Sequence, residues 1–100
     1  IPILSLGGLG VISVLSNAAP KYTHEMAMNY LNGKIIEAQD MQLDAIYLIK
    51  ALFSEVNPIP VKAALNMLGY NAGIPRLPLI EMSEKGKEKL EKELKKFELL

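Results

Sequence analysis

Three of the lysines are the side chains in this sequence best suited to covalent chemistry: Lys34, Lys50 and Lys62. A lysine that forms a Schiff base must be desolvated, so that its amine is neutral and lies close to a carbonyl carbon. Lys34 begins a helix-like stretch, Lys50 lies inside one, and Lys62 follows Val61 just after a proline-rich turn. None of the three falls on a predicted strand. We therefore interpret Lys62, the strongest of them, as a surface or interface lysine rather than a catalytic amine.

A glycine cluster near the start of the chain could form a phosphate-binding loop. A dinucleotide-binding fingerprint requires a third glycine and a helix that follows it. In "GLGVIS", residues 8–13, the third position is Ser13 and the segment leads into a strand-like run. The cluster is more typical of a tight turn that precedes a strand, so no nucleotide cofactor is expected.

The pair His24-Glu25 resembles the beginning of a zinc-protease helix motif. The second histidine of that motif would stand at position 28, which holds Met28, and the sequence has no other histidine. We therefore expect a solvated helix face here and no metal site. Four methionines could instead line a cofactor groove, but their helical spacing favours an ordinary core: Met26, Met28, Met41 and Met67.

The composition limits the class of protein. Half of the 100 residues are hydrophobic, which is enough for one small domain with a core. Eleven basic and eleven acidic residues cancel, which argues against nucleic-acid and anionic-membrane partners. The absence of cysteine excludes disulfides and thiolate metal sites. The apolar start is too short and glycine-rich for a membrane span or signal peptide, so we expect a soluble, cytoplasmic chain.

The elements that must position these residues begin with one strand-like segment. Residues 10–15 are continuously apolar except for Ser13, which is typical of a strand covered on both faces. The predicted strand is Val11–Val14, and the rest of the chain supplies no partner strand. The opening residues Ile1–Leu4 are also apolar and lack a methionine, which indicates that upstream sequence is absent.

Helical patterns fill most of the remaining sequence. Residues 20–33 predict a helix of about three turns, with Thr23 as its N-cap and Gly33 as the residue after its end. Residues 34–55 carry apolar side chains three or four positions apart, which predicts one long helix with a single apolar stripe.

Prolines and glycines divide the second half of the chain. Pro58 and Pro60 end the long helix and begin another over residues 61–68, with Gly69 after its end. Residues 70–79 predict an extended, turn-rich connection. Ser83 then caps a final helix that runs to about Phe97. That helix is amphipathic, with Leu90, Leu94 and Phe97 on one face and the pairs Glu88/Lys92 and Glu91/Lys95 on the other.

One strand and one helix followed by three helices predict an α/β fold in which the last βα unit of a barrel carries a helical appendix.

Three segments together resemble the C-terminal third of the dihydrodipicolinate synthase (4-hydroxy-tetrahydrodipicolinate synthase) family of pyruvate-dependent class I aldolases. They are "GGLGVISVLSNAAP" at 7–20, "LFSEVNPIPVKAALNMLGY" at 52–70 and "GIPRLPLIEMSE" at 73–84. Their order and spacing fit, so the resemblance covers essentially the whole chain.

The resemblance implies a C-terminal fragment of a TIM (β/α)8 barrel, mostly helical as an isolated chain. Residues 1–33 would be the end of the barrel, with the end of helix seven in Ile1–Leu6, strand eight in Val11–Val14 and helix eight after it. The composition of Ile1–Leu6 alone fits a strand equally well. Residues 34–100 would be the three-helix C-terminal extension.

The resemblance also implies an activity, a lyase reaction in lysine and diaminopimelate biosynthesis that condenses pyruvate with aspartate semialdehyde through a Schiff base. The family's Schiff-base lysine and catalytic tyrosine would lie before residue 1, and none of the tyrosines here matches that tyrosine: Tyr22, Tyr30, Tyr47 and Tyr70. Ile12 matches the residue that lines the pyruvate pocket through its backbone carbonyl. No metal or cofactor is implied.

The isolated chain is expected to be inactive, and the whole enzyme to be a homo-oligomer, a tetramer or a dimer. Two alternatives stay open. The chain could be a structural or assembly fragment, because an uncovered strand recruits partners. It could also belong to an aldolase similar to N-acetylneuraminate lyase, although the blocks "NPIPVKAAL" and "RLPL" favour the synthase.

Overall fold

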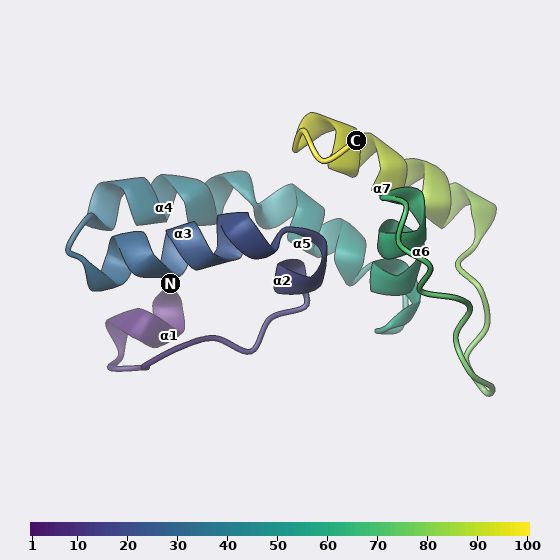
Figure 1. Ribbon diagram of the computed structural model, residues 1–100, viewed down its shortest axis with the longest axis horizontal. Helices are drawn as coiled ribbons and strands as arrows, with labels where there is room; N and C mark the ends of the chain where they lie inside the picture. Colours follow the sequence, from purple (N-terminus) through teal and green to yellow (C-terminus); the bar gives the residue numbers. More distant parts are fainter. The chain divides into compact units, whose positions relative to one another are not determined.

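The computed structural model describes residues 1–100 and contains seven helices and no β-strand (Figure 1). Its contacts divide the chain into two compact units, Ile1–Ile46 and Tyr47–Leu100. Each unit is described by itself. The division after residue 33, which concerns the parent barrel, stays a prediction.

The first unit is built around two helices that pack side by side, α3 (Pro20–Leu31) and α4 (Ile35–Asp44) (Figure 1). Met26 of α3 and Ala38 of α4 are buried, and the small Ala38 side chain is completely covered. The Tyr22 hydroxyl donates a hydrogen bond of 2.8 Å to the Met41 carbonyl and links the two helices. Two single-turn helices complete the unit, α1 (Pro2–Ser5) and α2 (Leu15–Ala18).

The second unit consists of most of α5 (Ile46–Leu52) together with α6 (Ile59–Met67) and α7 (Glu84–Lys96). Helices α6 and α7 are in contact. Four leucines form the centre of its core and are at most 1% exposed: Leu48, Leu52, Leu90 and Leu94. As predicted, residues 70–79 contain no helix and connect α6 to the segment before α7.

The predicted strand Val11–Val14 is wrong for this chain. Residues 9–13 have no regular secondary structure, and Leu15 already begins α2. A β-strand needs a neighbour to complete its ladder of backbone hydrogen bonds, and neither unit contains another strand. The apolar run therefore lacks the pairing that defines a strand.

Most predicted helix ends are confirmed because they depend on local chemistry. Gly33 and Gly69 follow α3 and α6 with φ values of 83° and 93°, a region that favours glycine. Pro60 lies in the first turn of α6, which begins at Ile59, two residues before the predicted start. The predicted Thr23 cap is wrong, because α3 begins at Pro20 and the Thr23 hydroxyl donates instead to the Ala19 carbonyl at 2.9 Å.

The single long helix predicted over residues 34–55 is also wrong in its extent. The structure has α4 and α5, which are separated at Ala45, and α5 ends at Leu52. The predicted apolar stripe persists through the interruption, because Ala38, Ala45 and Leu52 are all completely buried. No glycine or proline marks the interruption.

Candidate functional site

The segment around Ile12 is the place at which the family resemblance implies a substrate contact. Leu9 and Ile12 are almost fully exposed, at 94% and 108%, and Val11 is 50% exposed. The backbone N–H and C=O groups of residues 9–12 form no hydrogen bond. The segment therefore offers free backbone acceptors, the Ile12 carbonyl among them, for groups outside the chain.

The turn that precedes this segment explains the glycine cluster. Gly7 follows α1 with a φ of 93°, and a Cβ atom at Gly8 would meet the Ile3 backbone. The glycines thus form the tight turn that the sequence favoured over a phosphate loop. Helix α1 shows that Pro2–Ser5 are helical and not extended, while the assignment of Ile1–Leu6 to the end of barrel helix seven stays a prediction.

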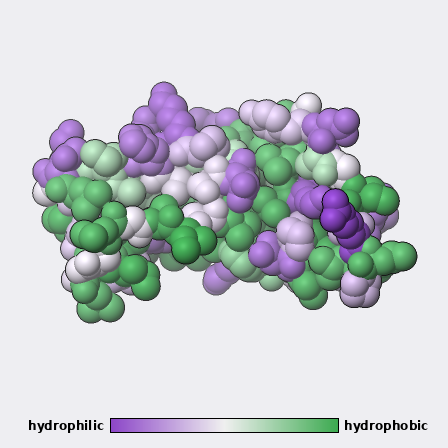
Figure 2. Space-filling view, turned by 60° about the horizontal axis from the view of Figure 1, so that its bottom comes forward, coloured by the Kyte–Doolittle hydropathy of each residue, from purple (hydrophilic) through white to green (hydrophobic).

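A groove beside Ile12 has a volume of about 580 Å³ and is lined by Ile3, Leu4 and Val11 among other apolar residues. No titratable side chain lines it. Hydrophobic residues reach the surface over wide areas (Figure 2), with Ile3 and Leu6 at 68% and 86% exposure. This region can therefore bind through its backbone and apolar surface, but it holds no acidic, basic or nucleophilic side chain.

The other residues singled out from the sequence do not gather into a site. Lys34 and Lys50 are exposed, and His24 lies exposed on α3. No group of three histidine, cysteine, aspartate or glutamate side chains lies close enough to hold a metal ion. No helix is long and apolar enough to cross a membrane.

The methionines divide between core and surface. Met26 is 6% exposed and belongs to the core, as predicted, and Met41 is half-buried. Met28 is 38% exposed, so its assignment to the core is wrong. Met67 lines a cavity in the second unit.

Tyr22 is the one side chain with a resolved pKa shift. Burial raises its pKa above the ordinary value, and the negative charge of Asp44 raises it further. Its hydroxyl donates a hydrogen bond to the Met41 carbonyl, so this tyrosine links α3 and α4. Tyr47 and Tyr70 are exposed at 69% and 66%.

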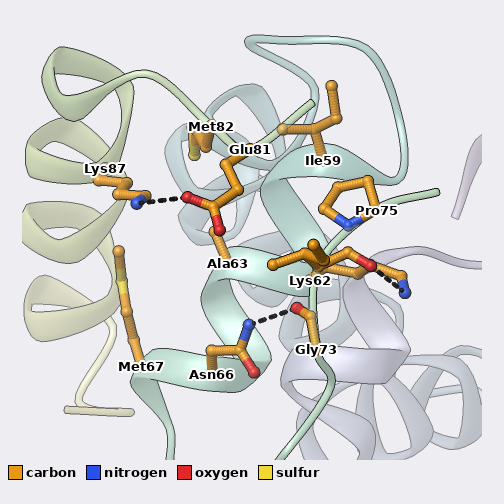
Figure 3. A pocket seen from close by; sticks show the side chains of 11 residues that line it. Ile59, Lys62, Ala63, Asn66, Met67, Gly73, Pro75, Glu81, Met82 and Lys87 are labelled. Atoms are coloured by element: carbon orange, nitrogen blue, oxygen red, sulfur yellow. Dashed lines mark hydrogen bonds and ion pairs between the residues drawn. The ribbon is translucent and has the colours of Figure 1, made fainter. Parts of the chain in front are cut away.

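The cavity of the second unit, which sequence reasoning missed, lies between α6, the connection at residues 73–75 and the beginning of α7 (Figure 3). Its volume is about 330 Å³. Its walls are largely apolar, with contributions from Ile59, Ala63, Met67, Pro75 and Met82.

Two polar residues one helical turn apart hold the connection against α6. Asn66 donates to the Gly73 carbonyl at 2.8 Å and accepts from the Ala72 N–H at 2.9 Å. The Lys62 ammonium lies 3.4 Å from the Ala72 carbonyl and 3.5 Å from that of Ile74. Lys62 and Asn66 are four residues apart, which places both on one face of the helix. This spacing is the feature of the sequence that could have indicated a shared polar contact. Lys62 is thus half-buried at the edge of the cavity.

On the side of α7, the cavity is bordered by an ion pair (Figure 3). The Lys87 ammonium lies 4.0 Å from the Glu81 carboxylate and 3.5 Å from the Glu84 carboxylate. Lys62 has no carboxylate within 4.0 Å. The cavity therefore has one neutralised lysine and one lysine without a counter-charge.

Comparison with known proteins gives one consistent result. The chain is 59% identical over all of its 100 residues to a 4-hydroxy-tetrahydrodipicolinate synthase of Thermoanaerobacter sp., of which it covers 34%. It resembles the crystal structure of dihydrodipicolinate synthase from Thermotoga maritima with a TM-score of 0.96 and 46% identity, over 99% of this chain and 34% of that one. A structure described as the first monomeric dihydrodipicolinate synthase variant matches with a TM-score of 0.94 and 46% identity, over 99% of this chain and 33% of that one.

The chain thus spans about a third of the length of the proteins that it matches. The profile of the Dihydrodipicolinate synthetase family matches residues 1–97, almost the whole chain. The chain belongs to the dihydrodipicolinate synthetase family.

Proposed function

We propose that this chain is the C-terminal part of a lyase that condenses pyruvate with aspartate semialdehyde in lysine and diaminopimelate biosynthesis. The observation that carries this proposal is the family match over residues 1–97, which leaves almost no part of the chain unassigned. A relative named for the synthase is 59% identical over the same length. That relative is about three times as long, so the activity is proposed for the whole protein and not for these residues alone.

In this proposal, residues 1–33 complete a TIM barrel and residues 34–100 form its helical extension. The Schiff-base lysine and the catalytic tyrosine come from the region that precedes this chain in its relatives. The Ile12 carbonyl lines the pyruvate pocket. Two features support that role: the carbonyl has no hydrogen-bond partner within the chain, and residues 9–12 have the free backbone groups that a strand between two neighbours would use.

The test is to join this chain to the preceding two thirds of the Thermoanaerobacter relative and to assay both proteins. We expect the fusion to form a pyruvate adduct that borohydride traps, and to consume aspartate semialdehyde. We expect the 100-residue chain alone to trap no pyruvate, because the Schiff-base lysine of this proposal comes from the region that precedes this chain in its relatives. Mass spectrometry of the adduct should place it outside the present sequence.

A matched control is Lys62→Met in the fusion, which should leave pyruvate trapping intact. Trapping on the isolated chain, or loss of trapping in a folded Lys62→Met fusion, would contradict this assignment of roles. A fusion that traps pyruvate but does not consume aspartate semialdehyde would support the Schiff-base aldolase chemistry. It would favour a different second substrate, such as that of an enzyme similar to N-acetylneuraminate lyase.

A second candidate function is that of an assembly fragment. The unpaired backbone of residues 9–12 favours it, together with the exposed Leu9 and Ile12 side chains, because an uncovered strand-like edge recruits another chain. Light scattering on the isolated chain should then show self-association. A single monomeric species of 11.0 kDa at high concentration would contradict this second function.

A further inference from the structure

We propose that the cavity of the second unit binds a small amphipathic monocarboxylate, with the carboxylate at Lys62 and the apolar body against α6 and Met82. The residues of this cavity do not include Ile12, and the inference does not depend on the lyase activity.

The size and lining of the cavity are those of a small-molecule site. Its volume of about 330 Å³ lies at the lower end of the range typical of ligand pockets. The walls include Ile59, Ala63, Met67 and Met82, so an aliphatic chain would be covered by apolar atoms. A few polar groups at the border, rather than a polar lining, would set the orientation of the ligand.

Lys62 supplies the positive charge for this site. Its contacts of 3.4 and 3.5 Å with backbone carbonyls exceed the usual range for N–H···O hydrogen bonds. An ammonium group has three N–H donors, so at least one is unused. A carboxylate at this position would form a shorter, charge-assisted hydrogen bond.

The side of the cavity opposite Lys62 favours a ligand that carries only one negative charge. Lys87 is already paired with Glu81 and Glu84, and Glu81 itself lines the cavity. Figure 3 shows the Lys62 nitrogen on the side of Gly73 and Pro75, while the Glu81–Lys87 pair lies on the side of α7. A second carboxylate on the ligand would approach Glu81 and be repelled by it.

The experiment compares hexanoate with its neutral analogue hexanamide by NMR titration of the isotope-labelled 100-residue chain. We expect hexanoate to shift backbone amide signals of α6, of residues 73–75 and of the start of α7. Hexanamide should bind about fivefold more weakly, since it lacks the charge that Lys62 recognises while filling the same space. The experiment measures binding and not catalysis. The monocarboxylate proposal can therefore fail while the lyase proposal stands, and the lyase proposal can fail while the monocarboxylate proposal stands.

Three variants separate recognition of charge from general packing. Lys62→Met should reduce the affinity for hexanoate to that for hexanamide, while Lys62→Arg should retain most of the preference for the acid. The control Lys50→Met removes an exposed lysine that does not line the cavity and should change neither affinity.

Equal affinities for the acid and the amide would overturn the proposal, as would shifts confined to residues outside the cavity or no binding of either probe. Undiminished hexanoate binding by a folded Lys62→Met chain would overturn it too. If Lys62→Met does not fold, the comparison of acid and amide on the unaltered chain decides the matter.

Discussion

The beginning of α7 depends on Ser83 and Gly86, which lie within one helical turn, and on Glu55, which is distant in the sequence; replacing Ser83 tests this arrangement. The Ser83 hydroxyl oxygen accepts a hydrogen bond from the Gly86 N–H at 3.1 Å, which makes Ser83 the N-cap of the helix. The same hydroxyl donates to one oxygen of the Glu55 carboxylate at 2.8 Å, and the Ser83 N–H donates to the other at 3.3 Å. Glu55 thus places a negative charge at the positive end of the α7 dipole.

Ser83→Ala removes both hydroxyl contacts. Loss of an N-cap costs about 1 kcal/mol, and loss of a hydrogen bond to an exposed carboxylate adds about 0.5 kcal/mol. The free energy of unfolding should therefore fall by about 1.5 kcal/mol. Asparagine and aspartate cap helices as well as serine in general. Ser83→Asn should therefore restore most of the loss, but Ser83→Asp would place a second carboxylate beside Glu55 and cost about 1 kcal/mol in repulsion.

The assay is urea unfolding followed by far-ultraviolet circular dichroism, with hydrogen exchange of the Gly86 amide as a local readout. The control repeats Ser83→Asp and Ser83→Asn in a Glu55→Gln background. Without the Glu55 charge, Ser83→Asp should become as stable as Ser83→Asn. Equal stability of Ser83→Asp and Ser83→Asn in the unaltered background would refute the reasoning, because it would show that Glu55 does not lie at this helix end.

Two further predictions concern the two units separately. Leu94→Ala removes a completely buried side chain from α7 and should lower the free energy of unfolding by about 3 kcal/mol. The control Leu77→Ala, at a position 86% exposed, should change the free energy of unfolding by less than about 0.5 kcal/mol. Comparable losses in the two variants would contradict the described core. Tyr22→Phe removes the 2.8 Å hydrogen bond to the Met41 carbonyl and should cost about 1 kcal/mol, measured by thermal unfolding. Because burial and Asp44 raise the pKa of Tyr22 in the folded chain above 10.0, its contribution is complete below that pH and is lost as pH rises through the folded-state pKa. Tyr22→Phe should therefore flatten the loss of stability in alkaline solution, and an unchanged alkaline profile would show that this tyrosine does not control it.

Only the tertiary structure accounts for one residue that contradicts local propensity. Gly86 lies in the first turn of α7, where glycine weakens a helix. A Cβ atom there would collide with the Glu55 carboxylate and crowd Ser83 and Met82. A side chain at this position would therefore displace the Glu55 carboxylate from Ser83, and since Glu55 is distant in the sequence, no local pattern could have shown this.

The ends of the later helices were predictable from the sequence because each depends on a few neighbouring atoms. Pro60 lacks an N–H that the first turn does not need, Gly69 adopts a φ that other residues avoid, and Ser83 caps the amides that follow it. The apolar spacing of α7 likewise identified Leu90 and Leu94 as core residues.

The strand at Val11–Val14 and the cavity beside Lys62 show what the sequence alone could not determine. A β-strand exists only with a partner, so an apolar run predicts the capacity to form a strand but not the strand itself. The cavity requires α6, the connection and α7 to meet, and their meeting depends on hydrogen bonds such as that from Asn66 to the Gly73 carbonyl. The sequence determined that the segments of α3, α6 and α7 become helices and where these helices end, through short-range sterics and hydrogen bonding. The tertiary structure decided which backbone groups stay unpaired and which side chains enclose a cavity, because both depend on contacts between distant segments.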